Sequence, residues 1–261
     1  MSLFYYPDTN RYFDPKKFAL TYEDGFLNSA DGNKINYWYF PSQSKTTKGL
    51  VVFFHGNAEN ISSHFGLLAW LPKESYSYII FDYPGYGQSS GTPTPESTVQ
   101  AGLAAVRYAA KAYPNAPLFL YGQSLGGNIV QKVANEIKHE IPVKAIVLES
   151  TFTSYGKVAR HALTKSWISW AFQPITYLVV SNNYAGHVEE ISPTPLLIIH
   201  GTSDRVIGYK MGEELYQKAK EPKQFLTIPN GDHGNTYFIN NGLYRKDLLN
   251  FLDQHSAQSK N

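Results

Sequence analysis

The chain has 261 residues, of which 43% are hydrophobic and 17% charged, with a formal net charge of +2 and no cysteine. Such a chain can bury a large core without disulfides or structural metals, and it has no thiol nucleophile or thiolate metal site. It contains neither a run of five basic residues nor a stretch of 18 apolar residues. These absences argue against nucleic acid as the main partner and against a transmembrane helix.

The chain begins with MSLFYYPDTNRYFDP, which lacks the layout of a signal peptide. Two origins of this start stay open: a native one, or one in which Met1 and Ser2 replace a signal or membrane anchor that has been removed. We treat residues 1–24 as an N-terminal extension. A membrane association through such an anchor, the compartment and the oligomeric state are left open at this point.

The predicted fold begins with a hairpin, because residues 25–28 and 35–40 flank the turn-forming dipeptide Asp31-Gly32. Six short, nearly continuous apolar runs follow. Runs of this kind are typical of parallel strands that are buried on both faces of a sheet. They span residues 50–54, 78–81, 118–121, 145–148, 196–199 and 225–228.

Segments with helical spacing alternate with these runs. They lie near residues 62–71, 96–112, 127–139, 209–220 and 241–254. Alternation of strands and helices implies right-handed crossovers and a doubly wound sheet. The sequence therefore predicts one α/β domain over residues 25–261, with a mostly parallel sheet of about eight strands and helices on both of its faces.

One interval, at about residues 151–190, is much longer than a crossover between neighbouring strands requires. It is rich in aromatic residues, among them Tyr155, Trp167, Trp170 and Phe172. We expect a small helical insertion above the sheet that serves as a lid or pocket wall for the substrate. A helix pair that packs on the core is the alternative.

Ser124 lies in the motif Gly-Gln-Ser-Leu-Gly, between an expected strand and an expected helix. A serine at such a turn has a strained backbone, and glycine at positions 122 and 126 avoids collisions on either side of it. The turn also presents the backbone N–H of Leu125 to negative charge at the start of the helix. This context predicts a nucleophile, and a tight turn without chemistry is the alternative.

A serine hydroxyl needs a general base, and the base needs an acid that orients it. Because the sites of open α/β sheets lie outside the carboxyl ends of the strands, we sought both in loops that follow strands. His233 lies in the loop after the last strand, and Asp204 in the loop after the strand before it. The order Ser124, Asp204, His233 is the triad order of one large class of hydrolases.

Four other residues near the expected strand ends compete with this triad or support it. Glu149 ends a strand and Asp232 adjoins the predicted base, so both are alternative acids. His200 also ends a strand, but we expect it to pack beneath the following loop. Asp82 is expected to hydrogen-bond local backbone and so to hold its own turn.

A second donor to the oxyanion is expected after the strand at residues 50–54. Gly56 lets the chain turn there, so that the backbone N–H of Asn57 and that of Leu125 would together bind the oxyanion. An N-terminal cap of the next helix is the alternative role for Asn57, and also for Asn60.

In their order along the chain, HGN, DYPGYGQS, GQSLGG, LES, GTSDRVI and GDH resemble the motifs of α/β-hydrolase-fold serine hydrolases, from about residue 25 to 252. HGNAEN, PGYGQSSGTPTPE and LESTFTS are most similar to the bud-emergence-type members, a group close to depalmitoylase-like and monoacylglycerol-hydrolysing enzymes. The resemblance implies hydrolysis of an ester or thioester of an apolar acyl group through an acyl-enzyme on Ser124. Its substrate would be a small acyl ester or an acylated molecule.

We expect no cofactor and no metal. Gly122–Gly127 has the glycine spacing of a phosphate-binding loop, but Asn128 stands where that motif needs lysine. Two other functions stay open. A peptidase of the prolyl-peptidase type shares the G-x-S-x-G-G pattern, and a non-catalytic binding protein can retain the same fold.

Overall fold

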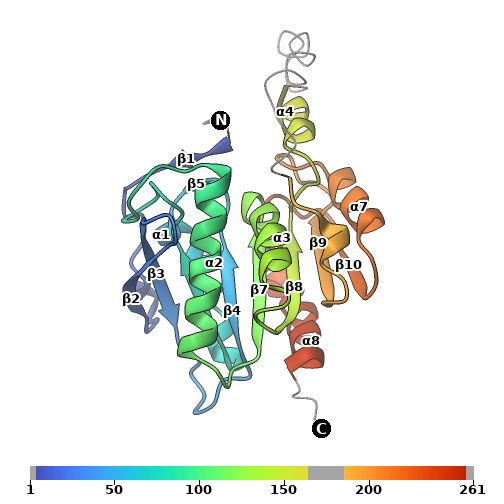
Figure 1. The fold of residues 1–261 in the computed structure, drawn as a ribbon. Helices are drawn as coiled ribbons and strands as arrows, with labels where there is room; N and C mark the ends of the chain where they lie inside the picture. Colours follow the sequence, from blue (N-terminus) through green and yellow to red (C-terminus); the bar gives the residue numbers. More distant parts are fainter. Residues whose placement is uncertain (1–3, 164–184, 257–261) are drawn as a thin grey trace.

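A computed structural model describes residues 4–163 and 185–256. Its centre is an eight-stranded sheet in the order β10-β9-β8-β7-β4-β6-β3-β2 (Figure 1). The hairpin of β2 and β3 is antiparallel, β3 is antiparallel to β6, and the other neighbouring pairs are parallel. The strands are β2 (Glu23–Asn28), β3 (Lys34–Phe40), β4 (Gly49–Phe54), β6 (Tyr76–Phe81), β7 (Leu118–Gln123), β8 (Val143–Glu149), β9 (Leu196–Gly201) and β10 (Lys223–Ile228). The predicted fold class, a mostly parallel α/β sheet, is confirmed.

The core has two layers, one on each face of the sheet. In β4, Leu50, Val52 and Phe54 pack on one face, while Val51 and Phe53 pack on the other. Side chains alternate between the faces of a strand, so a strand covered on both faces must be apolar throughout. This double burial explains the continuous apolar runs.

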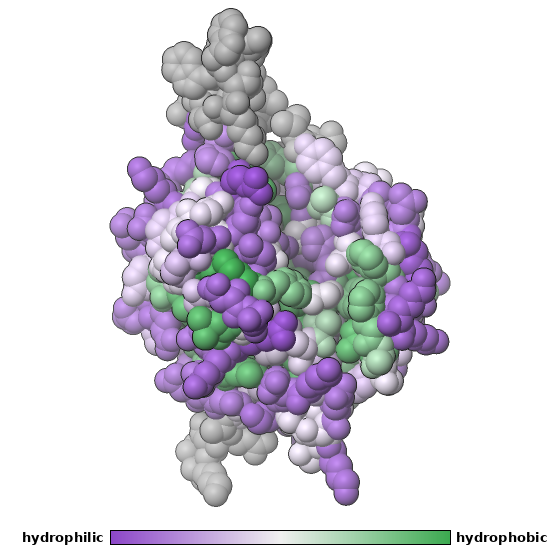
Figure 2. Space-filling model, turned by 180° about the vertical axis from the view of Figure 1, so that it is seen from behind, coloured by the Kyte–Doolittle hydropathy of each residue, from purple (hydrophilic) through white to green (hydrophobic). Residues whose placement is uncertain are grey.

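Helices cover both faces. The first layer contains buried residues of α2 (Pro95–Ala112), α3 (Leu125–Ile137) and α7 (Tyr209–Lys218). The second contains buried residues of the segment 61–74 and of α8 (Arg245–Ser256). Figure 2 shows the molecule from behind relative to Figure 1, as a largely hydrophilic surface with several hydrophobic patches.

The segment predicted as one helix near residues 62–71 is instead three short pieces. They are α1 (Ile61–His64) and the 3₁₀ helices η3 (Phe65–Leu68) and η4 (Leu71–Glu74). Pro72 accounts for part of the difference, because proline has no N–H for the helical ladder and its ring clashes with the preceding turn.

The last helix also starts later than predicted. Asn240 and Asn241 both have left-handed backbone angles, with φ of 51° and 55°. A regular helix cannot pass through them, and α8 accordingly begins at Arg245.

The N-terminal segment lies against the body of the protein. In a two-stranded sheet that the sequence did not predict, β1 (Tyr6–Pro7) pairs in parallel with β5 (Ala58–Glu59). A 3₁₀ helix, η2 (Pro15–Phe18), follows, and Leu20 is buried. Figure 1 shows β1 at the same end of the molecule as α4 (Tyr155–Leu163).

The long interval at 151–190 begins with α4 and ends with the 3₁₀ helix η6 (Val188–Glu190). Tyr155 is buried and packs edge-to-face on Phe152. The other predicted lid residues, Trp167, Trp170 and Phe172, lie outside the described residues.

Candidate active site

Ser124 occupies a sharp turn between β7 and α3. Its backbone has φ of 55° and ψ of −119°, a combination that costs free energy and is found mainly at functional sites. Its N–H donates to the backbone oxygen of Glu149 at 2.9 Å, and its own backbone oxygen accepts from the Thr151 hydroxyl at 2.6 Å. The end of strand β8 and the second residue after it therefore hold the strained turn in place.

The two glycines of the motif are required by close packing. A Cβ at position 126 would lie 2.0 Å from the backbone oxygen of Phe54, and one at position 122 would lie 2.5 Å from the Cα of Gly127. The start of α3 can therefore approach the end of β4. A Cβ at Gly56 would lie only 3.7 Å from the Cβ of Ser124, so the loop after β4 runs directly beside the serine.

Asp204 and His233 are in direct contact. The Nδ1 of His233 lies 2.9 Å from Oδ2 of Asp204. Oδ1 of the same carboxylate accepts from the backbone N–H groups of Val206 and Ile207, at 2.9 and 2.8 Å. Burial tends to raise the pKa of Asp204, but these hydrogen bonds outweigh it and hold the pKa below its ordinary value.

The contact with a carboxylate also defines the state of the imidazole. Because an ionised carboxylate only accepts hydrogen bonds, Nδ1 of His233 carries the proton and Nε2 is left as the basic nitrogen. The loop that bears His233 lies against the residue before Ser124, since a Cβ at Gly234 would be 3.1 Å from the Gln123 amide nitrogen. The three sequence-predicted residues therefore lie at one edge of the sheet.

Asp232 is paired elsewhere. Its Oδ2 accepts from Nε of Arg205 at 2.8 Å, and its Oδ1 accepts from the backbone N–H of His233, also at 2.8 Å. The Arg205 guanidinium lowers the pKa of Asp232 to about 2. This carboxylate supports the loop and does not contact the imidazole ring of its neighbour.

Glu149 and His200 lie beneath the site. Glu149 is buried and accepts a hydrogen bond from the Tyr121 hydroxyl at 2.6 Å, and burial raises its pKa. His200 is buried and donates from Nε2 to the backbone oxygen of Ile207 at 2.8 Å. As predicted, His200 packs beneath the loop, where it supports the backbone next to Asp204.

The backbone oxygens of the loop at residues 55–58 are all held by donors. His55 Nδ1 donates to the oxygen of Gly56 at 2.7 Å, and His64 Nε2 donates to the oxygen of Ala58 at 2.8 Å. Two tyrosine hydroxyls complete the set: that of Tyr83 donates to the oxygen of His55 at 2.9 Å, and that of Tyr86 to the oxygen of Asn57 at 2.8 Å.

This arrangement orients the predicted oxyanion donor. In a trans peptide, the C=O and the N–H point in opposite directions. The hydrogen bond from His55 to the Gly56 oxygen therefore also sets the direction of the Asn57 N–H. Capping of α1 is performed by Asn60, whose side chain accepts from the N–H of Ser62 at 2.9 Å, so that Asn57 is not needed for it.

Sequence reasoning missed these supporting residues, and for Asp82 it was wrong. Asp82 does not hold its own turn through its carboxylate; Oδ1 accepts from the N–H of Ile61, 21 residues away, at 2.9 Å. It lies 3.6 Å from Nε2 of His55, and burial raises its pKa to about 8. The signal for the two tyrosines was present in the motif DYPGYG, which places both next to this aspartate.

Two further observations concern the described ranges alone. Among residues 4–163 and 185–256, no three His, Asp or Glu side chains are placed to hold a metal ion. In the same ranges, every helix is too short or too polar to span a lipid bilayer.

Comparison with known proteins then decides the family. Residues 45–189 match the family model described as serine aminopeptidase, S33. The chain belongs to this family. It is 33% identical to the protein YfhR of Escherichia coli O157:H7, over 97% of this chain and 87% of that protein. It is also 27% identical to the lysophosphatidylserine lipase ABHD12 of Macaca fascicularis, over 74% of this chain and 50% of that protein.

The fold is shared with solved structures. The esterase Pf2001 of Pyrococcus furiosus superposes with a TM-score of 0.77 at 19% identity, and 98% of each chain is covered. The protein is thus an α/β-hydrolase-fold member of a serine hydrolase family, as the sequence motifs indicated.

Proposed function

We propose that this S33-family protein cleaves a carboxylic ester or thioester of an apolar acyl group, with Ser124, His233 and Asp204 as its catalytic triad. The observation that carries the proposal is the 2.9 Å contact between His233 and Asp204, at the edge of the sheet where Ser124 has a strained backbone. This pairing leaves Nε2 of His233 as the base that a serine nucleophile requires.

In the proposed reaction, Nε2 of His233 takes the proton of the Ser124 hydroxyl as its oxygen attacks the acyl carbonyl. Asp204 stabilises the imidazolium that forms. The oxyanion accepts hydrogen bonds from the N–H groups of Asn57 and Leu125. The imidazolium then protonates the leaving group, and a water molecule activated by the same imidazole releases the acid from the serine.

The ester class is supported by two kinds of relative. One curated relative is named a lysophosphatidylserine lipase, and a solved structure of the same fold is named an esterase. The motif HGNAEN, together with LESTFTS, further favours the bud-emergence-type subgroup. No step of the proposed mechanism requires a cofactor.

A fluorophosphonate probe tests the nucleophile. We expect it to label the wild-type protein and not Ser124→Ala. Ser150→Ala is the matched control, because Ser150 also follows the end of a strand, is buried and has a positive φ of 48°. Labelling that persists in folded Ser124→Ala, or that is absent from folded wild type, would overturn the proposal.

A peptidase is the second candidate, favoured by the family description, which names an aminopeptidase. A series of p-nitrophenyl esters from acetyl to palmitoyl, with a thioester and aminoacyl p-nitroanilides beside it, separates the two. The ester proposal predicts that kcat/KM for the best ester exceeds that for every anilide after correction for leaving-group reactivity. A preference for an anilide would assign the same triad to peptide hydrolysis.

A further inference from the structure

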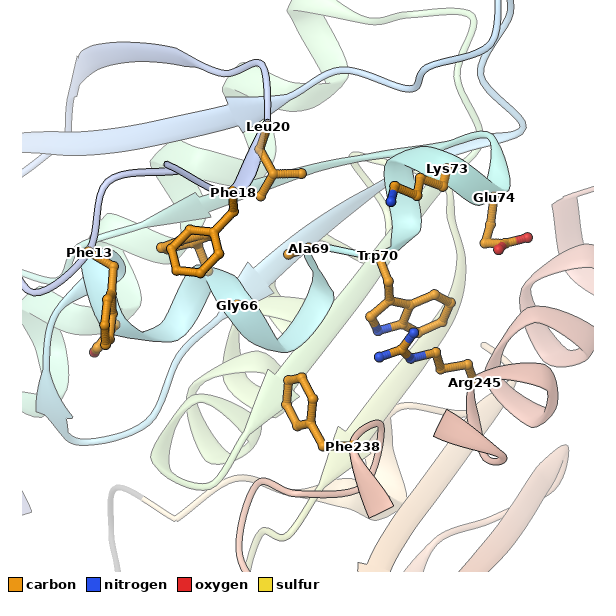
Figure 3. Close-up of a pocket in the computed structure, with 12 residues that line it drawn as sticks. Phe13, Phe18, Leu20, Gly66, Ala69, Trp70, Lys73, Glu74, Phe238 and Arg245 are labelled. Atoms are coloured by element: carbon orange, nitrogen blue, oxygen red, sulfur yellow. The ribbon is translucent and has the colours of Figure 1, made fainter. Parts of the chain in front are cut away.

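The structure contains a pocket with a volume of about 470 Å³ (Figure 3). Its walls come from three parts of the chain that are far apart in sequence: the N-terminal segment, the short helices of residues 61–74, and residues 238–245. Neither the predicted triad nor the predicted oxyanion donors line it. Its volume falls within the range of about 300–1,000 Å³ that is typical of small-molecule sites.

One end of this pocket is aromatic. Phe13 and Phe18 lie there, and Phe238 lies between them and Arg245 in Figure 3. These three residues are 52%, 58% and 54% exposed to solvent, respectively. Phe18 packs edge-to-face on Phe65, which is buried and also lines the pocket. Exposed phenyl rings from separate segments that meet at one cavity are unusual on a soluble surface and mark a site for an apolar ligand.

The other end is cationic. The guanidinium of Arg245 lies 5.4 Å from the centre of the Trp70 ring, and its Nε donates to the backbone oxygen of Tyr237 at 3.0 Å. Lys73 lines the same end. In Figure 3 the nitrogen atoms of Lys73 and Arg245 project toward the middle of the view, whereas Glu74 lies at its outer edge.

Both cations are available to a ligand. Among residues 4–163 and 185–256, neither Lys73 nor Arg245 forms an ion pair. Arg245 lies over the Trp70 ring and donates to Tyr237 through Nε, which leaves its terminal nitrogens to bind. A guanidinium held in this way loses little conformational freedom when it binds a carboxylate.

We propose that this pocket binds a single-chain amphiphile with an anionic head group, of the fatty carboxylate class. The aromatic end would take the apolar chain, and Arg245 and Lys73 would take the head group. An anion matches the two cations, and a neutral or cationic amphiphile would leave them desolvated without a partner. The lining of the pocket shares no residue with the proposed catalytic centre, and binding does not depend on the chemistry there.

Calorimetric titration with monomeric laurate tests the proposal on the full chain and on Ser124→Ala. We expect saturable binding with the same Kd for both, and weaker binding as the salt concentration rises. Dodecyltrimethylammonium, which has the same chain and the opposite charge, should bind at least tenfold more weakly. Equal affinity for the two amphiphiles would overturn the proposal.

Charge variants locate the site. Arg245→Gln should weaken laurate binding about tenfold, the loss expected for one charge-assisted hydrogen bond. Lys246→Gln, which removes the same charge one residue away and outside the pocket, should leave Kd within twofold. Glu74→Gln should tighten binding, because it removes the acidic side chain at the rim. An unchanged Kd in Arg245→Gln, with thermal unfolding like that of wild type, would place laurate elsewhere.

The apolar end has its own pair of variants. Phe238→Ala should weaken laurate binding severalfold, whereas Leu243→Ala, at an exposed apolar residue that does not line the pocket, should not. Sedimentation with phosphatidylglycerol vesicles provides the last arm. Binding to vesicles without binding of monomeric laurate would overturn the proposal in favour of a membrane-docking surface.

Discussion

The hydrogen bond from His55 to Gly56 provides a sharp test of the proposed oxyanion hole. His55→Leu removes the donor but keeps a side chain of similar bulk, so the peptide that carries the Asn57 N–H loses its restraint. Loss of one such bond corresponds to about 1 kcal/mol, or about fivefold in rate. Loss of the whole oxyanion donor corresponds to about 3–4 kcal/mol, or about 10²–10³ in rate.

We therefore expect kcat of His55→Leu to fall by between about fivefold and 10³-fold, with little change in KM because the donor acts mainly on the transition state. His55→Asn is the matched control, since its amide nitrogen is attached at the same position as Nδ1 and can donate to the Gly56 oxygen. The two variants should also differ in stability. Asn leaves a cavity where the ring of His55 packed against Tyr83, whereas Leu fills most of it.

We therefore expect activity and stability to rank the two variants in opposite order: His55→Asn is the less stable and the more active of the two. Hydrolysis of p-nitrophenyl butyrate gives kcat and KM, and thermal unfolding gives the relative stability. A merely structural role for His55 would make activity follow stability. If His55→Leu turns over within twofold of wild type, or if both variants lose activity equally, the assignment of the Asn57 N–H is refuted.

Three other predictions follow from the same structure. Asp204→Asn keeps an oxygen for the two backbone N–H groups but cannot stabilise an imidazolium. Ester turnover should therefore fall by about 10³–10⁴, with a melting temperature within a few degrees of that of wild type. Near-normal turnover would contradict the triad. Gly126→Ala places a Cβ 2.0 Å from the Phe54 oxygen and should destabilise the folded protein by about 3 kcal/mol, measured as a large drop in melting temperature. Gly66→Ala is the control, because nothing lies within 4 Å of its added Cβ, and its melting temperature should not show this drop. Burial raises the pKa of Asp82 to about 8, so the native state keeps a proton that the unfolded carboxyl releases near pH 4, and stability must fall as pH rises from about 4 to 8. Asp82→Asn removes this decline, so its melting temperature relative to wild type should rise from pH 5 to pH 8. A constant difference in melting temperature would argue against a protonated Asp82.

The strands were predictable because strands that are buried on both faces appear in the sequence as continuous apolar runs. All six runs are strands of the eight-stranded sheet. Each is either covered on both faces or lies at the edge of the sheet. The pieces around Pro72 and Asn240 were not predicted, because local backbone restrictions there override the helical periodicity. The strand pair of β1 and β5 was not predicted either, since two-residue strands carry no pattern of their own.

The candidate site was likewise predicted only in part from the sequence. The order of motifs along the chain, with Ser124, Asp204 and His233 each after a strand, was enough to assign all three to one edge of the sheet. Asp204 was predicted as the acid, but Asp232 stayed an alternative, because both lie in loops beside that edge. The separation comes from Arg205, which takes the carboxylate of Asp232, while the carboxylate of Asp204 lies against the imidazole.

Local sequence patterns were enough to predict the sheet, the serine turn and the edge where the candidate site lies, because burial periodicity and glycine placement act over a few neighbouring residues. Which polar groups contact each other depends instead on the tertiary structure. The pairs His55 with Asp82, Tyr86 with Asn57, and Arg245 with Trp70 join residues from 27 to 175 positions apart in the chain. Contacts of that kind depend on how whole elements pack, and no local pattern records them.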